Sequence, residues 1–327
     1  MKNRKRFKFW KVVRNILFAI VTVCVVWFMI HLVMTKYEQQ KYPARGEFVE
    51  VEGKQMHVYT KGEGENTIVL LSGLGTPAPA MDFEPLMNEL SKTNKVVVVE
   101  AFGYGWSETT NRGRTVENIV EETRAALQQS NIKGPYILMP HSISGIYSMY
   151  YANRYPDEVK AIIGIDSTLP QMMEYFGESA FPTMPNYMSY LAPSGIARFM
   201  VYFQPNEVLP HAEKGTYTEE NLRITKAISA WKTYNKNVVA EMNELKNNVD
   251  KTKHMTLPSD LPVMIFTPKE DNVFGKSKIS FYQTQLQHVN MNQLVVLEGE
   301  HYLHWTRYKE MSKYVNGFLD SMSGTVH

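Results

Sequence analysis

The chain has 327 residues, of which 44% are hydrophobic and 21% are charged, a globular composition that excludes a wholly disordered, fibrous or many-pass membrane protein. The formal net charge is +2, but residues 1–14 hold seven of the 35 basic residues and no acid, so the remainder has 28 basic against 33 acidic residues, a net charge of −5. This balance removes the electrostatic basis for nucleic-acid binding. Cys24 is the only cysteine, which excludes a disulfide or a cysteine-ligated metal site within one chain.

The first predicted element is a membrane-spanning helix. Residues 16–34 carry no formal charge, and nineteen residues in a helix are long enough to cross the hydrocarbon layer. A cleaved signal peptide is the alternative, but the apolar run exceeds the usual ~7 to 15 residues and no A-x-A-like site follows it. The basic segment precedes the span, so the positive-inside rule predicts a cytoplasmic amino end and an exported remainder. We therefore predict a cytoplasmic segment at 1–14, a transmembrane helix at 15–35 and a polar linker at 36–46.

The exported part alternates predicted strands and helices. A hairpin is predicted from alternating apolar positions at 48–51 and 56–60, and a helix from apolar residues at helical spacing over 116–127. Continuous apolar runs predict further, buried strands at 67–71, 95–99, 136–139, 161–165, 263–266 and 294–297. Such strands, separated by helices, predict a mostly parallel sheet covered on both faces, an α/β architecture.

One long stretch lacks this pattern. Residues 168–258 contain scattered aromatic residues and methionines but no comparable strand sequence. We predict that they form a helical cap inserted into an α/β core made of residues 47–167 and 259–327.

Ser142 stands where a predicted strand turns sharply into a predicted helix. Such a strained turn exposes the serine hydroxyl and needs small residues two places to either side, where glycine is usual. Here Pro140 and Ser144 occupy those two places. The alternative role for Ser142 is to cap the amino end of the helix.

Four motifs together resemble those of the α/β-hydrolase superfamily, and the resemblance runs from about residue 48 to 318 apart from the cap. They are LLSGLG at 70–75 with Ser72 in place of histidine, EAFGYGWS at 100–107, PHSISG at 140–145, and EHYLH at 300–304 with Glu300 in place of glycine. The resemblance implies an α/β-hydrolase fold with a mostly parallel sheet, helices on both faces and an inserted helical cap, here preceded by one transmembrane helix. It also implies a Ser-Asp-His triad in that order along the chain.

The resemblance assigns Ser142 as the nucleophile and His301 as the base. A histidine with a pKa near 6.5 can accept the serine proton and return it to the leaving group. The imidazole needs a carboxylate behind it. We favour Asp271, in the loop where the family usually places its acid, with Glu270 and Asp166 as alternatives. His141 is expected to be a buried histidine with its hydrogen bonds satisfied, and His304 a packing or surface residue, rather than the base.

The oxyanion formed on attack requires two preorganised donors, and backbone N–H groups serve without side-chain reorganisation. The resemblance places these donors at Leu74, which follows the loop glycine Gly73, and at Ile143, which follows the nucleophile. A plain tight turn is the alternative explanation for the glycines around Leu74.

These residues predict acyl transfer to water from an ester, thioester or amide, with no cofactor and no metal. An epoxide hydrolase or haloalkane dehalogenase of the same superfamily would be expected to carry aspartate at position 142. Apolar cap residues are predicted to bind an acyl or lipid-like small molecule, or else only to pack the cap onto the sheet: Met172, Met173, Phe176 and Tyr187.

Two other functions remain open. One is an aminopeptidase-like hydrolase, although the usual Gly-Gly-Ser-Trp-Gly elbow of that branch is missing. The other is a non-catalytic binding or scaffold protein that retains the hydrolase fold, which the departures at Ser72, Pro140, Ser144 and Glu300 would favour.

Overall fold

An eight-stranded sheet lies at the centre of the computed structural model, which describes residues 2–177, 181–269, 272–273 and 275–324. Its spatial order is β1-β2-β4-β3-β5-β6-β7-β10. The first two pairings, β1 with β2 and β2 with β4, are antiparallel, and the pairings from β4 to β10 are parallel. The strands are β1 (Glu47–Val51), β2 (Lys54–Lys61), β3 (Thr67–Leu71), β4 (Lys95–Val99), β5 (Tyr136–Pro140), β6 (Val159–Ile165), β7 (Val263–Pro268) and β10 (Asn292–Leu297). Every strand predicted from the sequence is present.

Helices cover both faces of the sheet, because successive residues of each buried strand point to opposite faces. In β3, Val69 packs on the face shared with α4 (Val116–Gln129), α5 (Ser144–Arg154) and α11 (Lys278–Leu286). Its neighbours Ile68 and Leu70 pack on the other face. That face is covered by α3 (Glu84–Leu90) and α13 (Tyr308–Met322), beside the short helices α2 (Pro79–Asp82) and α12 (Leu303–Thr306). Both apolar faces of the sheet are thereby buried.

The described residues between β6 and β7 form helices without a strand, as predicted for an inserted cap. They are α6 (Met172–Phe176), η2 (Asn186–Tyr190), α7 (Leu191–Ser194), α8 (Ile196–Phe203), η3 (Pro205–Glu207), α9 (Glu219–Lys232) and α10 (Lys236–Thr252). The two longest have polar amino-terminal caps, since Thr218 accepts from the N–H of Asn221 and Asn235 accepts from that of Asn237. The chain also forms η1 (Pro156–Glu158) and a small hairpin of β8 (Asn272–Val273) and β9 (Lys276–Ser277).

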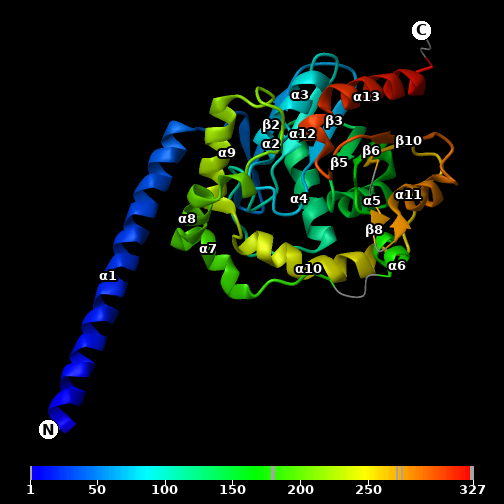
Figure 1. The fold of residues 1–327 in the computed structure, drawn as a ribbon. Coiled ribbons are helices and arrows are strands. Elements are labelled where there is room, and N and C mark those ends of the chain that lie inside the picture. The colour runs from blue at the N-terminus through cyan, green and yellow to red at the C-terminus, as the bar shows by residue number, and fades with distance from the viewer. Residues whose placement is uncertain (1, 178–180, 270–271, 274, 325–327) are drawn as a thin grey trace.

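A single long helix, α1 (Lys2–Lys41), projects away from this body (Figure 1). It is long and apolar enough to cross a membrane. It does not end near residue 35 as predicted, and the first half of the predicted linker is helical. The reason is a buried contact with the cap: Glu38 accepts two hydrogen bonds from Arg198 of α8, at 2.6 and 2.7 Å, and one from Trp231 of α9 at 2.8 Å. These partners hold the polar turn in the helix.

Candidate active site

The serine elbow predicted at position 142 is formed. Ser142 follows β5 directly and has a backbone φ of +54°, a left-handed conformation that is unfavourable for a residue with a side chain. Its N–H donates to the carbonyl oxygen of Ile165 at 3.2 Å, and its own carbonyl accepts from the N–H of Thr168 at 2.8 Å. Ser144, which replaces the usual glycine, donates its hydroxyl to the carbonyl oxygen of Ser72 at 2.5 Å. The departure from glycine therefore ties the elbow to the glycine loop.

His301 is held by a buried aspartate at the same edge of the sheet. Its Nδ1 lies 2.6 Å from Oδ2 of Asp166, whose side chain is fully buried at the carboxyl end of β6. Lys278 of α11 donates to the same oxygen at 2.7 Å. Burial alone would raise the pKa of Asp166, but the hydrogen bond from His301 and the charge of Lys278 outweigh burial and lower it. Asp166 is therefore an ionised acceptor for the imidazole near neutral pH.

Among the residues that the structure describes, the carboxylate that contacts His301 is that of Asp166, one of the alternatives to the favoured Asp271. Both Asp271 and Glu270 lie outside the described residues. Asp166 follows a strand that is the direct neighbour of the strand carrying Ser142. Because carboxyl ends of parallel strands meet at one edge, this neighbourhood brings the two residues together.

His141 links the serine elbow to His301. Its ring centroid lies 4.7 Å from that of His301, and its Nε2 lies 3.2 Å from the carbonyl oxygen of His301. Within the part of the chain that the structure describes, no hydrogen bond joins the Ser142 hydroxyl to the His301 ring. Such bonds often tighten only when substrate is bound.

His141 is fully buried, as expected, but its Nδ1 has no hydrogen-bond partner in the described structure. Burial, followed by the nearby His304 and His301, lowers the pKa of His141 well below 6.5. The native state therefore keeps this ring neutral. An unfolded chain binds a proton there below about pH 6.5, so the free energy of unfolding should fall as the pH drops below this value.

We expect this loss to approach ~1.4 kcal/mol per pH unit between pH 6.5 and 5, and expect it to be absent in His141→Asn. Urea denaturation of both proteins across this range measures the difference. His57, whose pKa is raised because Glu100 outweighs the effect of burial, has the opposite pH dependence but is common to both proteins. Parallel pH profiles for the two proteins would contradict the prediction.

A second buried histidine–aspartate pair lies beside the first. His304 Nε2 is 2.7 Å from Oδ2 of Asp82, and Trp305 donates to the other carboxylate oxygen at 2.8 Å. His304 is therefore a buried, partnered residue, as the packing assignment expected. No local pattern in the sequence indicated Asp82, which lies in the short helix α2.

The glycine loop and the elbow both offer free backbone donors. In the described structure, neither the N–H of Leu74 nor that of Ile143 donates a hydrogen bond. A Cβ on Gly73 would lie 2.9 Å from the His141 ring and 3.2 Å from Cβ of Ser142, so the loop packs closely on the elbow. Next along, the N–H of Gly75 donates to the Tyr104 hydroxyl at 3.2 Å. This bond fixes the loop from its far side.

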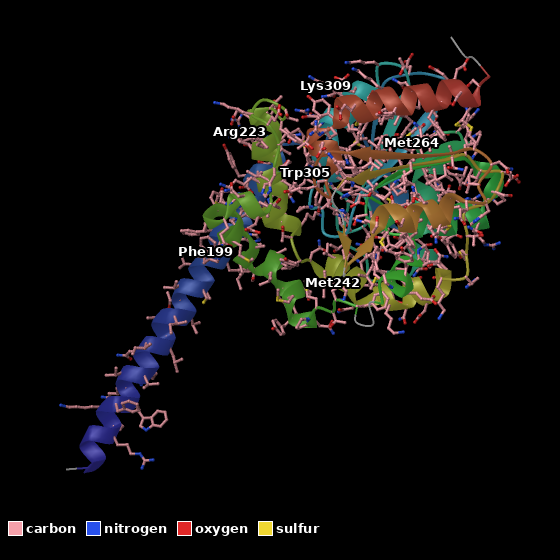
Figure 2. All side chains as sticks on the ribbon, turned by 45° about the vertical axis from the view of Figure 1, so that its right-hand side comes forward. Phe199, Arg223, Met242, Met264, Trp305 and Lys309 are labelled. Carbon is pink, nitrogen blue, oxygen red and sulfur yellow. The ribbon has the colours of Figure 1, made fainter. Side chains whose placement is uncertain are left out.

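A cavity of about 470 Å³ opens beside the glycine loop. From the core it is bordered by Leu74, Tyr302 and Trp305, and from the cap by side chains of α8 and α10. Figure 2 labels Trp305 and Met242, which lie on these two sides. Its apolar cap lining consists of Ala197, Met200, Val201, Val208, Leu209, Val238 and Met242. Polar cap residues line it as well, among them Gln204, Asn206, Glu207 and His211, and the cavity adjoins the loop at Leu74.

The cap residues predicted to bind substrate do not line this cavity. Met172 and Phe176 are buried in the core between the cap and α11, Met173 packs against that core, and Tyr187 is 69% exposed. Met172, Met173 and Phe176 thus pack inside the protein, whereas Tyr187 faces outward. The described residues also include no group of three or more His, Cys, Asp or Glu side chains able to hold a metal ion.

Comparison with known proteins agrees with this architecture. Residues 66–308 match the model of the alpha/beta hydrolase fold family. The uncharacterized protein YbdG of Bacillus subtilis is 35% identical over 283 residues, covering 84% of this chain and 85% of that protein. The 2-(acetamidomethylene)succinate hydrolase of Mesorhizobium japonicum is 30% identical over 113 residues, 35% of this chain and 39% of that enzyme.

Among solved structures, epoxide hydrolase VrEH1 of Vigna radiata superimposes with a TM-score of 0.65 at 19% identity, covering 84% of this chain and 97% of that one. At this identity the likeness shows the fold alone. The family resemblance inferred from the four motifs is confirmed, and relatives that are named hydrolases support an enzyme.

Proposed function

This chain belongs to the alpha/beta hydrolase fold family, and we propose that it is a membrane-anchored serine hydrolase that cleaves an ester, thioester or amide through an acyl-enzyme on Ser142. The observation that carries the proposal is the 2.6 Å contact between His301 and the buried Asp166, at the sheet edge that also carries the strained Ser142 elbow. A histidine held by a buried carboxylate is the base that a serine hydroxyl needs.

In the proposed mechanism, Nε2 of His301 removes the proton of the Ser142 hydroxyl as its oxygen attacks the substrate carbonyl carbon. Asp166 fixes the imidazole through Nδ1 and stabilises the imidazolium that forms. The N–H groups of Leu74 and Ile143 donate to the oxyanion. His301 then protonates the leaving group, and the acyl-enzyme is hydrolysed when His301 activates a water molecule.

We propose Asp166, rather than Asp271, as the acid of the triad. Support comes from its contact with His301 and from Lys278, which donates to the same carboxylate oxygen and favours its ionised form.

Membrane anchoring is the second part of the proposal. The apolar part of α1 spans the bilayer, with the basic amino end in the cytoplasm and the hydrolase domain outside. Support comes from the exposure of large apolar side chains along α1, such as Phe18, which is 74% exposed. The folded body leaves these side chains uncovered.

Labelling with a fluorophosphonate tests the hydrolase proposal, because only an activated serine reacts with this probe. The full-length protein in detergent should become labelled, and Ser142→Ala should not. Ser130→Ala serves as the control, since Ser130 ends α4 away from the elbow, and should keep the labelling. An unlabelled wild type, or a labelled Ser142→Ala protein, would refute the assignment and favour the non-catalytic alternative.

The substrate class follows from the apolar cavity beside Leu74. We expect kcat/KM for p-nitrophenyl esters to rise with acyl chain length, by up to roughly fourfold per methylene group, since burying one CH₂ is worth ~0.8 kcal/mol. The increase should stop once the cavity is filled. Steady-state kinetics on a series of chain lengths measures this, and a flat profile would reject the acyl-binding role of the cavity.

A further inference from the structure

Helix α8 of the cap has an outward face of large apolar side chains. Ile196, Phe199 and Phe203 are 50%, 52% and 70% exposed, while Arg198 and Val201 on the opposite side are buried. Neighbouring exposed apolar side chains of this kind are typical of a surface that contacts a protein partner or a membrane.

The same helix packs directly on α1. Trp27 of α1 donates its indole N–H to the carbonyl oxygen of Gly195 at 3.2 Å, and its ring meets that of Phe199 edge to face at 6.2 Å. A Cβ on Gly195 would lie 2.7 Å from the His31 side chain, so the two helices approach as closely as a glycine allows. The apolar face of α8 is therefore continuous with the exposed apolar surface of α1 (Figure 2).

The contact with α1 determines how deep α8 lies relative to the membrane surface. The uncharged run of α1 covers residues 16–34, and Trp27 lies seven residues before its end, which at 1.5 Å per residue is about 10 Å inside the hydrocarbon layer. Arg198 instead binds His31 at 3.1 Å, in the last turn of the run, and Thr35 at 3.0 Å and Glu38, just beyond its end. One helix thus presents apolar side chains at hydrocarbon depth and its guanidinium at the membrane surface, as interfacial helices do.

The part of α1 that lies in the membrane cannot be shifted far enough toward the amino end to leave α8 in water. Moving it by two turns toward the amino end would bring Lys11 and Arg14 into the hydrocarbon layer, at a cost of several kcal/mol by insertion scales. The buried contacts of Arg198 with Glu38 and His31 hold α8 at its level on α1.

We propose that the outward face of α8 is immersed in the bilayer, in the leaflet next to the hydrolase domain, where it contacts lipid acyl chains. The inference rests on the proposed anchoring by α1. Ala197, Met200 and Val201 of the same helix line the cavity beside Leu74. The helix in the membrane is therefore also a wall of the cavity, and an amphiphilic ester can pass from the leaflet to the active site along α8.

Depth-dependent fluorescence quenching tests the immersion. In a Cys24→Ala background, Ile196→Cys or Phe203→Cys is labelled with bimane and the full chain is reconstituted into phosphatidylcholine vesicles. Vesicles with brominated acyl chains then report contact with lipid, and iodide reports contact with water. The controls are Val296→Cys, at an exposed position of β10, and the otherwise unmodified chain labelled at Cys24 within α1.

We expect the labels at positions 196 and 203 to lose most of their emission in brominated vesicles and to be several-fold less sensitive to iodide than the label at 296. Quenching by brominated lipid at Cys24 but not at 196 and 203 would overturn the immersion while leaving the anchor intact. Absence of quenching at all three would overturn both. Protection from iodide without lipid quenching would show that another protein copy covers α8, which also overturns the proposal. Circular dichroism melting confirms folding of each variant without relying on the hydrolase activity.

Discussion

Replacing Asp166 by asparagine is expected to lower kcat by about 10⁴-fold, the effect seen when a triad loses the carboxylate that orients its histidine. The amide keeps the shape of the side chain but removes the negative charge, so His301 loses the partner that stabilises its protonated form. Asp271→Asn is the matched control and should leave kcat close to that of the wild type. Rates of ester hydrolysis at saturating substrate, together with thermal melting of each variant, measure the effect.

Asp166→Asn also replaces the carboxylate that Lys278 contacts at 2.7 Å by a neutral amide, which removes one favourable interaction of that ammonium group. The double variant Asp166→Asn/Lys278→Met removes the ammonium group as well, and kcat should stay low in it. Should Asp271→Asn abolish turnover while Asp166→Asn preserves it, the acid would be the one favoured from the sequence.

His301→Ala is expected to reduce kcat by roughly 10⁴- to 10⁶-fold, because loss of the base leaves only the oxyanion donors and substrate binding to accelerate the reaction. The His301 side chain is 41% exposed, so its removal should cost little stability and leaves a space open to solvent. Added imidazole should therefore restore part of the rate.

The control for His301→Ala is His254→Ala, an exposed histidine after α10 that should keep wild-type turnover. Initial rates with and without imidazole measure both variants. A His301→Ala enzyme that retains its activity would show that another group takes the serine proton.

The central strands of the sheet could be predicted from the sequence because they are buried on both faces. Runs such as TIVLL in β3 and KVVVV in β4 have no polar face, and this pattern distinguishes them from surface helices. The Ser142 elbow could be predicted only from the resemblance of four motifs, because Pro140 and Ser144 replace the usual glycines and a serine at this place could equally cap the helix.

The identity of the carboxylate beside His301 could not be settled in this way. Asp166 and Asp271 each follow an apolar run that predicts a parallel strand, so the sequence allows either carboxylate at the sheet edge predicted for Ser142. The choice depends on the path of each loop and on Lys278, which lies 112 residues from Asp166 in the chain. Neither the loop paths nor the contact with Lys278 can be predicted from a local sequence pattern.

The cap was the least predictable part for a related reason. Met172 and Met242 are both apolar cap residues, yet one is buried in the core and the other borders the cavity. Hydrophobicity indicates that a side chain is removed from water but not which surface removes it. The extension of α1 to Lys41 likewise depends on Arg198, far along the chain.

The position of Asp166 also limits how this protein can be re-engineered. The insertion that is proposed to bind substrate starts two residues after it, and the N–H of Thr168 donates to the carbonyl oxygen of Ser142. The proposed acid is thus directly connected to the first residues of the insertion. A chimera that takes its cap from a relative should therefore keep residues 166–168 of this chain and join the foreign cap after them. A junction placed directly at the end of β6 would exchange the proposed triad acid together with the cap.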